Sequence, residues 1–202
     1  DVTELDVAPA TPAGLSASEV LYESNGQVLS KVIVGWRPVS NAPRYILRYR
    51  YENNNWTTVT TRSPDYEILN SGVGRYYLEL QAESSGFKRS GTATANFDAL
   101  GKTAPPETIP ELFIAPIDDK SAELYWPQAV DLDVRIGGQV RIRHTPEIGV
   151  NATWGRANDI VPAVAGSSTR KIVPLLEGTY IIRAVDSTGN ESTGVASVVV
   201  DL

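Results

Sequence analysis

Few residues in this sequence could take part in catalysis. The chain has one histidine, His144, and no cysteine, which excludes thiol nucleophiles, disulfides and cysteine-ligated zinc. His144 ends an alternating segment, and neither a serine nor a carboxylate stands beside it. We interpret it as a structural residue at the edge of a core, with a binding role as the less favoured alternative. The chain is therefore predicted to have no catalytic residue and not to be an enzyme.

Two short acidic clusters are the candidate metal ligands: Asp118 with Asp119, and Asp131 with Asp133. Calcium prefers carboxylate-rich loops, but EF-hand spacing is absent and aspartate is also a common turn former. Turn formation is the favoured interpretation and calcium binding remains the alternative, so no metal or cofactor is predicted. The same pairs could act as a glycosidase acid and base, but the small β-domains predicted below imply no substrate cleft.

Composition restricts the classes of partner. The 202 residues carry a net charge of −6, which disfavours binding to a nucleic-acid backbone. No apolar run approaches the roughly 18 residues of a membrane-spanning helix, so no membrane insertion is predicted. No basic N-terminal region precedes an apolar block, so no signal peptide is predicted. Methionine is absent even at position 1, and we expect the chain to be a piece of a longer polypeptide.

Alternating residues predict strands throughout the chain. In the first half, Val32, Val34 and Trp36 share one face of a segment, and Tyr76 begins another in which every second residue is apolar. No segment has a sustained helical period, so the class is all-β. The predicted strands of the first half lie at 15–22, 32–36, 45–51, 56–61, 66–69 and 76–82, with a seventh after the turn that ends near Gly91.

The second half repeats this pattern. The segment from Tyr180 to Gly194 repeats the hairpin that runs from Tyr76 to Gly91. We predict two domains, at 1–102 (with a lead-in at 1–12) and 103–202, joined by a proline-rich linker that begins near Gly101. The inward residues predicted for the second domain are Ala122, Leu124, Trp126, Val140, Ile142, His144, Tyr180, Ile182 and Ala184, with Ile181 and Arg183 outside. Residues 127–138 form either a hairpin around two glycines or a loop, and the loop is favoured.

These residues resemble the fibronectin type III family over nearly the whole chain. The tryptophan that ends the second strand, the tyrosine-rich third strand and the pattern from Tyr76 to Ala82 match its core positions. The resemblance implies two tandem fibronectin type III (immunoglobulin-like) β-sandwiches. In the second domain the position usual for the corner tyrosine holds Gly178, so no tyrosine corner is expected there.

A narrower resemblance is to the modules of phage tail tip attachment proteins, also called host specificity protein J. It rests on residues 36–39, 44–51 and Trp56, and on 131–144 and 178–192. It implies a non-enzymatic module in the virion that spaces and docks the distal tail for host attachment. The implied partners are other tail proteins in a trimeric hub, with a bacterial surface receptor or glycan as a second class. The alternative is an extracellular bacterial module of a carbohydrate-active enzyme or adhesin, and a third, weaker class is an animal cell-surface receptor fragment.

Arginines on the outward face give the candidate contact site. The third and sixth strands are neighbours in a fibronectin type III sandwich, so Arg48 and Arg50 should lie near Glu79. In the second domain the same positions hold Arg141, Arg143 and Arg183, with no acid expected on that stripe. We predict that these three arginines contact an acidic partner or an anion. The alternative is that they extend into solvent.

Overall fold

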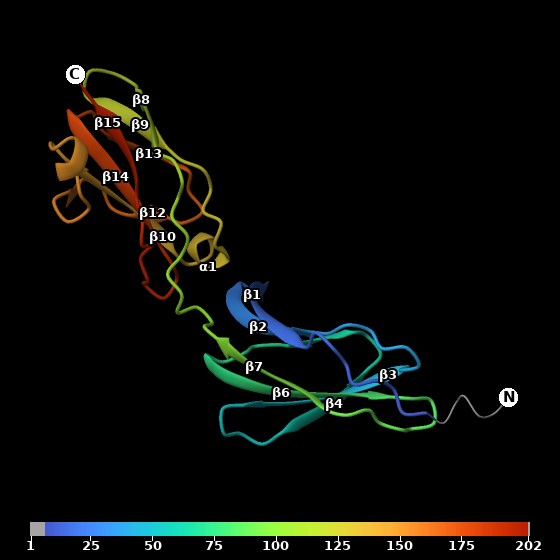
Figure 1. Cartoon of the computed structure of the whole chain (residues 1–202). Helices are drawn as coiled ribbons and strands as arrows, with labels where there is room; N and C mark the ends of the chain where they lie inside the picture. The colour runs from blue at the N-terminus through green and yellow to red at the C-terminus, as the bar shows by residue number, and fades with distance from the viewer. Residues whose placement is uncertain (1–6, 202) are drawn as a thin grey trace. The chain divides into compact units, whose positions relative to one another are not determined.

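The computed structural model describes residues 7–201, which form two compact units (Figure 1). The first unit contains β1 to β7 except for residues 23–28, which group with the second unit. The second unit contains β8 to β15, and the chain passes from the first to the second at Gly101 and Lys102. Within this range the helical elements are α1 (Leu132–Arg135) and a 3₁₀ turn at Gly149–Asn151. The predicted all-β class is confirmed. No helix in the described part is long and apolar enough to cross a membrane.

Two antiparallel sheets form the first unit. One has the strand order β1-β2-β5 and the other β4-β3-β6-β7. This three-plus-four sandwich is the fibronectin type III arrangement that the sequence resemblance implied. The strands are β1 (Ser16–Ser24), β2 (Gln27–Gly35), β3 (Arg44–Tyr51), β4 (Thr57–Thr61), β5 (Asp65–Ile68), β6 (Gly74–Glu83) and β7 (Ala93–Ala99).

Alternation along the strands builds the core of this unit. Because successive side chains point to opposite faces, every second residue of β2 and β6 enters the interior. Val32, Val34 and Leu80 are fully buried, and Leu78 nearly so. Trp36 packs edge-on against Tyr45, with 5.2 Å between the ring centroids. The predicted inward face of these strands is confirmed.

The second unit has the same two-sheet plan. Its sheets have the orders β13-β9-β8 and β11-β10-β14-β15, and β12 also pairs with β10. All nine residues predicted to point inward are buried, from Ala122 to Ala184. The strands are β8 (Phe113–Pro116), β9 (Ser121–Tyr125), β10 (Gln139–Thr145), β11 (Asn158–Asp159), β12 (Val164–Ala165), β13 (Arg170–Pro174), β14 (Gly178–Val185) and β15 (Ala196–Val200).

The segment 127–138 is a loop that contains the single helical turn α1. The loop alternative is therefore confirmed and the hairpin is wrong. Val134 of α1 is fully buried in the core. Gly138 permits this close packing, because a Cβ atom there would lie 2.5 Å from Val185 O and 2.6 Å from Val134 O. The two glycines thus bring the loop against the sheet and do not turn a hairpin.

Both units have a tyrosine corner, which corrects the expectation for the second. The Tyr76 hydroxyl accepts a hydrogen bond from Gly72 N at 3.0 Å. The Tyr180 hydroxyl accepts one from Leu176 N at 2.7 Å and donates one to Pro174 O at 2.6 Å. The later strand is two residues shorter between its tyrosine and the alanine before the turn. Because side chains alternate between the two faces, shortening the strand by two residues leaves the tyrosine on the inward face. The tyrosine corner is therefore present, although counting six residues back from Ala184 leads to Gly178 and not to Tyr180.

The predicted lead-in and the predicted linker have equivalent roles in the two units. A Cβ atom on Gly91 would lie 2.6 Å from Thr11 Oγ1, and one on Gly194 would lie 2.5 Å from Thr108 Oγ1. Pro9 and Pro106 stand at matching positions before these threonines, and both are buried. Residues 1–6 of the lead-in lie outside the described range. From Lys102 onward the linker segment therefore packs along the second unit as residues 7–15 pack along the first.

Candidate partner-contact surface

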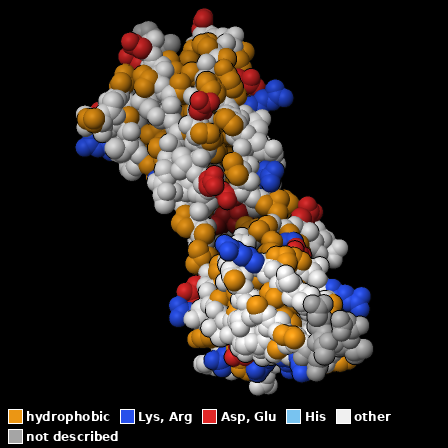
Figure 2. All heavy atoms as spheres, turned by 45° about the vertical axis from the view of Figure 1, so that its right-hand side comes forward, with side chains coloured by type: hydrophobic (Ala, Val, Ile, Leu, Met, Phe, Trp, Pro, Cys, Tyr) orange, Lys and Arg blue, Asp and Glu red, His pale blue; other side chains and the backbone are white. Residues whose placement is uncertain are grey.

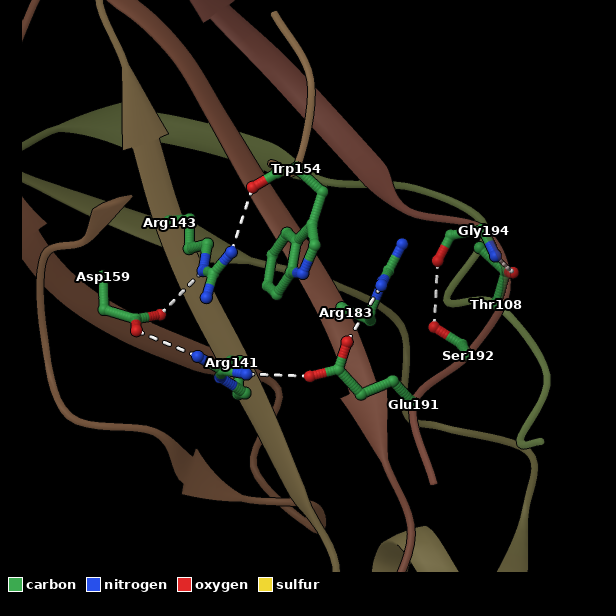
Figure 3. Close-up of polar contacts among 9 residues, drawn as sticks. All are labelled: Thr108, Arg141, Arg143, Trp154, Asp159, Arg183, Glu191, Ser192 and Gly194. Atoms are coloured by element: carbon green, nitrogen blue, oxygen red, sulfur yellow. Dashed lines mark hydrogen bonds and ion pairs between the residues drawn. The ribbon is translucent and has the colours of Figure 1, made fainter. Parts of the chain in front are cut away.

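The three predicted contact arginines lie together on the outward face of the second unit (Figure 3). In the register of β10 and β14, Arg141 is opposite Arg183 and Arg143 is opposite Ile181. On the other side of β10, Arg143 is opposite Asp159 of β11. Ile181 is fully buried although it was expected outside. Trp154 lies over the arginines of this face (Figure 3).

Two carboxylates pair with these arginines, so the expectation of a stripe without acids is wrong. Glu191 lies 2.7 Å from Arg141 Nη1 through Oε1 and 2.9 Å from Arg183 Nη1 through Oε2. Asp159 lies 2.9 Å from Arg141 Nη2 and 3.0 Å from Arg143 Nε. Neither acid belongs to β10 or β14: Asp159 is on β11, and Glu191 follows the turn after β14. Reasoning from two strands alone could not find them.

Trp154 lies over all three guanidinium groups. Its ring centroid is 4.3 Å from the Cζ of Arg143, 4.9 Å from that of Arg183 and 5.7 Å from that of Arg141. Arg143 also donates a hydrogen bond to Trp154 O at 3.0 Å. Cation–π contacts of this kind strengthen when the cation is shielded from water. The only sequence signal for this residue was an isolated tryptophan in a polar loop.

Hydrogen bonding keeps these groups charged. A hydrogen bond from Arg183, together with one from Arg141, lowers the pKa of Glu191 despite its partial burial. Burial raises the pKa of Asp159, but its hydrogen bonds to Arg143 and Arg141 outweigh burial and leave the pKa lowered. For Arg141, burial lowers the pKa and the two carboxylates more than restore it. With three cations and two anions, the cluster is a weakly basic, internally paired surface.

The first unit has a related but different arrangement at the same positions. Arg48 is opposite Glu79 in the register and lies 2.9 Å from its carboxylate, which confirms that prediction. Arg50 does not pair with Glu79. Its guanidinium lies 5.1 Å from the ring centroid of Trp56 and 4.6 Å from that of Tyr77.

His144 is buried at the end of β10, as predicted. Its Nε2 lies 3.0 Å from Glu177 O, and its ring packs against Tyr180 with 4.7 Å between centroids. Burial lowers the pKa of His144, although the Glu177 carbonyl opposes this. These contacts fit a structural residue at the core edge.

The four aspartates of the acidic clusters occupy separate environments. Asp118 Oδ1 accepts hydrogen bonds from Lys120 N and Ser121 N at 2.9 and 2.7 Å, which is the geometry of a turn former. Asp131 Oδ2 accepts one from Glu107 N at 2.6 Å. Asp133 is buried, and burial together with the charge of Asp186 raises its pKa. No group of three potential metal-ligating side chains occurs among residues 7–201.

No protein-family model and no curated protein matches this sequence. Among solved structures, it is similar to the FN1–FN3 domains of chicken CNTN1, with 16% identity, a TM-score of 0.41, and coverage of 96% of this chain and 69% of that one. It is also similar to a segment of two fibronectin type III domains from chicken tenascin, with 21% identity, a TM-score of 0.41, and coverage of 95% of this chain and 99% of that one. A single-domain match, FN3tt mut, has 18% identity and a TM-score of 0.37 over 46% of this chain and 97% of that one. All three TM-scores are below 0.5. The strand order and register described above define each unit as a β-sandwich of the fibronectin type III kind.

Proposed function

We propose that this chain is a non-enzymatic structural and interaction module of a phage tail tip host-recognition protein, where it spaces and docks the distal tail for host attachment. The tail tip assignment is supported by the sequence resemblance in residues 36–39, 44–51 and Trp56, and in 131–144 and 178–192. The spacing role is supported by one observation, the way in which the chain is held where it passes from one sandwich to the next.

Hydrogen bonds hold the chain on both sides of the peptide bond between Gly101 and Lys102. In the first unit, Leu100 N and Gly101 N donate to the carboxylate of Glu19, each at 2.8 Å. In the second, Lys102 O accepts hydrogen bonds from Thr188 Oγ1 at 3.0 Å and Asn190 Nδ2 at 3.1 Å. Gly101 is thus hydrogen-bonded within the first unit and Lys102 within the second.

The docking role is assigned to the outward faces of the two sandwiches. The proposed partners are neighbouring tail proteins in a trimeric hub, with a bacterial receptor or glycan beyond them. Arg141, Arg143 and Arg183 remain the proposed contact residues, but as a preorganised and paired cluster, not as free charges. The face drawn in Figure 2 carries its basic side chains as separate spots among acidic and apolar ones.

Two experiments test this function. Antibodies against the chain, applied to phage particles that contain this sequence, should label the distal tail tip in electron micrographs and reduce adsorption. Label on the bacterial surface instead would overturn the assignment. For the spacing role, a Gly-Ser-Gly-Ser insertion between Gly101 and Lys102 should reduce adsorption, whereas the same insertion after Asn54, in an exposed turn, should not. Equal adsorption of the two variants would reject the spacing role.

A further inference from the structure

The turns that follow β6 and β14 have the same backbone hydrogen bonds. In the first unit, Ser84 N donates to Lys88 O at 2.9 Å and Phe87 N to Ser84 O at 3.0 Å. In the second, Asp186 N donates to Asn190 O at 3.0 Å and Gly189 N to Asp186 O at 3.2 Å. Phe87 and Gly189 therefore occupy the same position, the one at which this turn requires the left-handed conformation.

A phenylalanine at this position is strained. Gly189 has φ of +93° and Phe87 has φ of +66°, a region that glycine adopts freely and a bulky side chain does not. Burial does not compensate, because Phe87 is 71% exposed. One contact of its ring is with the Arg44 guanidinium, at 4.4 Å from the ring centroid. A residue that is both strained and exposed is better explained by a contact with another molecule than by stability.

Two adjoining hollows lie beside Phe87, both lined by Pro43 and Ser85. One has a volume of about 430 Å³ and is lined largely by small and apolar residues, including Val39 and Ala42. The other, of about 400 Å³, lies between Phe87, Arg44 and Arg62. Each has room for side chains of an extended peptide, within the range of small ligand pockets.

The rim of these hollows is basic. The carboxylate of Glu83 serves two guanidinium groups, with distances of 2.9 Å to Arg44 and 3.2 Å to Arg89. Arg62 has no ion pair among the residues that the structure describes. The surplus of positive charge around an apolar depression favours an occupant that combines acidic and apolar side chains.

We propose that Phe87 and the two hollows form a docking groove for an extended segment of a partner protein in which apolar and acidic side chains alternate. Apolar side chains of the segment enter the hollows and contact Phe87, and its carboxylates pair with Arg62 and Arg44. This groove belongs to the first unit alone. It is distinct from the arginine cluster under Trp154 and does not depend on assignment to a phage tail.

The binding test uses a fluorescein-labelled heptapeptide of alternating Glu and Leu, titrated with the full chain and followed by anisotropy. Phe87→Gly should weaken binding by about tenfold or more, and a peptide of alternating Lys and Leu should bind more weakly still. Leu69→Ser, which alters a 59% exposed leucine elsewhere in the same unit, should leave binding unchanged. Undetectable binding, equal binding by Phe87→Gly, or stronger binding to vesicles of anionic lipid than to the peptide would overturn the proposal.

A stability test separates a docking residue from a structural one. Phe87→Gly removes the strained side chain, so its melting temperature should equal or exceed that of the parent protein. Gly189→Phe should lower it, because it creates the strain in a turn where a Cβ atom at this position would meet no atom within 4 Å. A clear drop in melting temperature for Phe87→Gly would show that the ring stabilises the fold, and the proposal would fail.

Discussion

Arg50 and Arg143 occupy the same place in the two units, yet the two units hold these arginines by different means. Each stands one residue before the partner of a corner tyrosine: Tyr51 is opposite Tyr76, and His144 is opposite Tyr180. The guanidinium of Arg50 lies over the rings of Trp56 and Tyr77. Arg143 pairs with Asp159 at 3.0 Å and also lies under Trp154. The fold therefore determines the position of this arginine on the sheet, but the groups that contact its guanidinium differ between the two units.

This difference predicts different responses to the solvent. An ion pair is screened by salt, whereas stacking on an aromatic ring retains a dispersion and packing contribution that salt does not remove. The arginine cluster of the second unit should therefore depend on both salt and pH, and the Arg50 cluster mainly on its rings. Each unit also provides a control for the other, because matching positions can be changed in the same chain.

The core tryptophans should give the largest effects. Trp36 and Trp126 are both buried, so replacing either with alanine should cost about 3–5 kcal/mol of unfolding free energy. The change to phenylalanine separates them. Trp126 Nε1 donates to Ser168 O at 3.0 Å, whereas Trp36 Nε1 is buried without a hydrogen-bond partner. Trp126→Phe should therefore cost about 1 kcal/mol more than Trp36→Phe.

Denaturant unfolding of the four variants measures these differences. The near-ultraviolet signal reports loss of packing, and separate transitions would identify the unit that each variant affects. Alanine variants that unfold like the parent would show that the assigned cores are wrong. Equal losses for the two phenylalanine variants would remove the role given to the Ser168 hydrogen bond.

The tyrosine corners should give the next largest effect. Tyr180→Phe removes a hydroxyl that both accepts from Leu176 N and donates to Pro174 O. Tyr76→Phe removes one that accepts from Gly72 N. An ordinary hydrogen bond contributes about 0.5–1.5 kcal/mol net, so we expect Tyr180→Phe, which loses more hydrogen bonds, to cost more than Tyr76→Phe. Thermal unfolding of both variants checks the order, and a larger loss for Tyr76→Phe would contradict it.

The sequence predicts most of the fold because alternation is a local property. Val32, Val34 and Trp36 specify an inward face without knowledge of the rest of the chain, and so do Val140, Ile142 and His144. The corner at Tyr180 was missed because its position was counted from the turn. Strand length between a corner and a turn can change by two residues without changing the face. The turn α1 was missed because four residues are too short for a period to be seen.

The partners of the arginine cluster could not be predicted, because they come from elements that only the folded chain brings together. Asp159 lies on a two-residue strand, and Glu191 comes after a turn at which it pairs with Val185. Trp154 comes from a loop with no periodic signal. Alternation thus placed the three arginines correctly and gave the wrong electrostatic environment. The contact role of the cluster stays a prediction, and Arg143→Glu alone cannot test it because it would also break the pairing with Asp159.

Glu191→Gln should have a smaller effect that depends on pH. The pKa of Glu191 is lowered by its arginine partners, so its contribution is present above the ordinary carboxyl pKa of about 4.3 and is lost as pH falls through the lowered value. At pH 7 the variant should lose about 1 kcal/mol, and the difference from the parent should shrink as the pH falls below about 4. The matched change Glu79→Gln removes only one arginine contact and should cost less. A difference between parent and Glu191→Gln that is constant with pH would contradict the assigned charge pairing.

Calcium or EDTA should have the smallest effect, a melting temperature that does not change. Among the described residues, paired aspartates occur only in loops of the second unit. Two of them already accept hydrogen bonds from backbone amides: Asp118 from Lys120 N and Ser121 N of its own turn, and Asp131 from Glu107 N. Asp133 is buried, and burial raises the pKa of its carboxyl, so it is not exposed as a ready calcium ligand. To bind Asp131, a calcium ion would have to break its hydrogen bond from Glu107 N. Binding would therefore change the conformation of the chain where it enters the second unit. A rise of several degrees on adding calcium, reversed by EDTA and absent in Asp131→Asn, would show that these aspartates are ligands and that the linker is the part of the molecule that calcium controls.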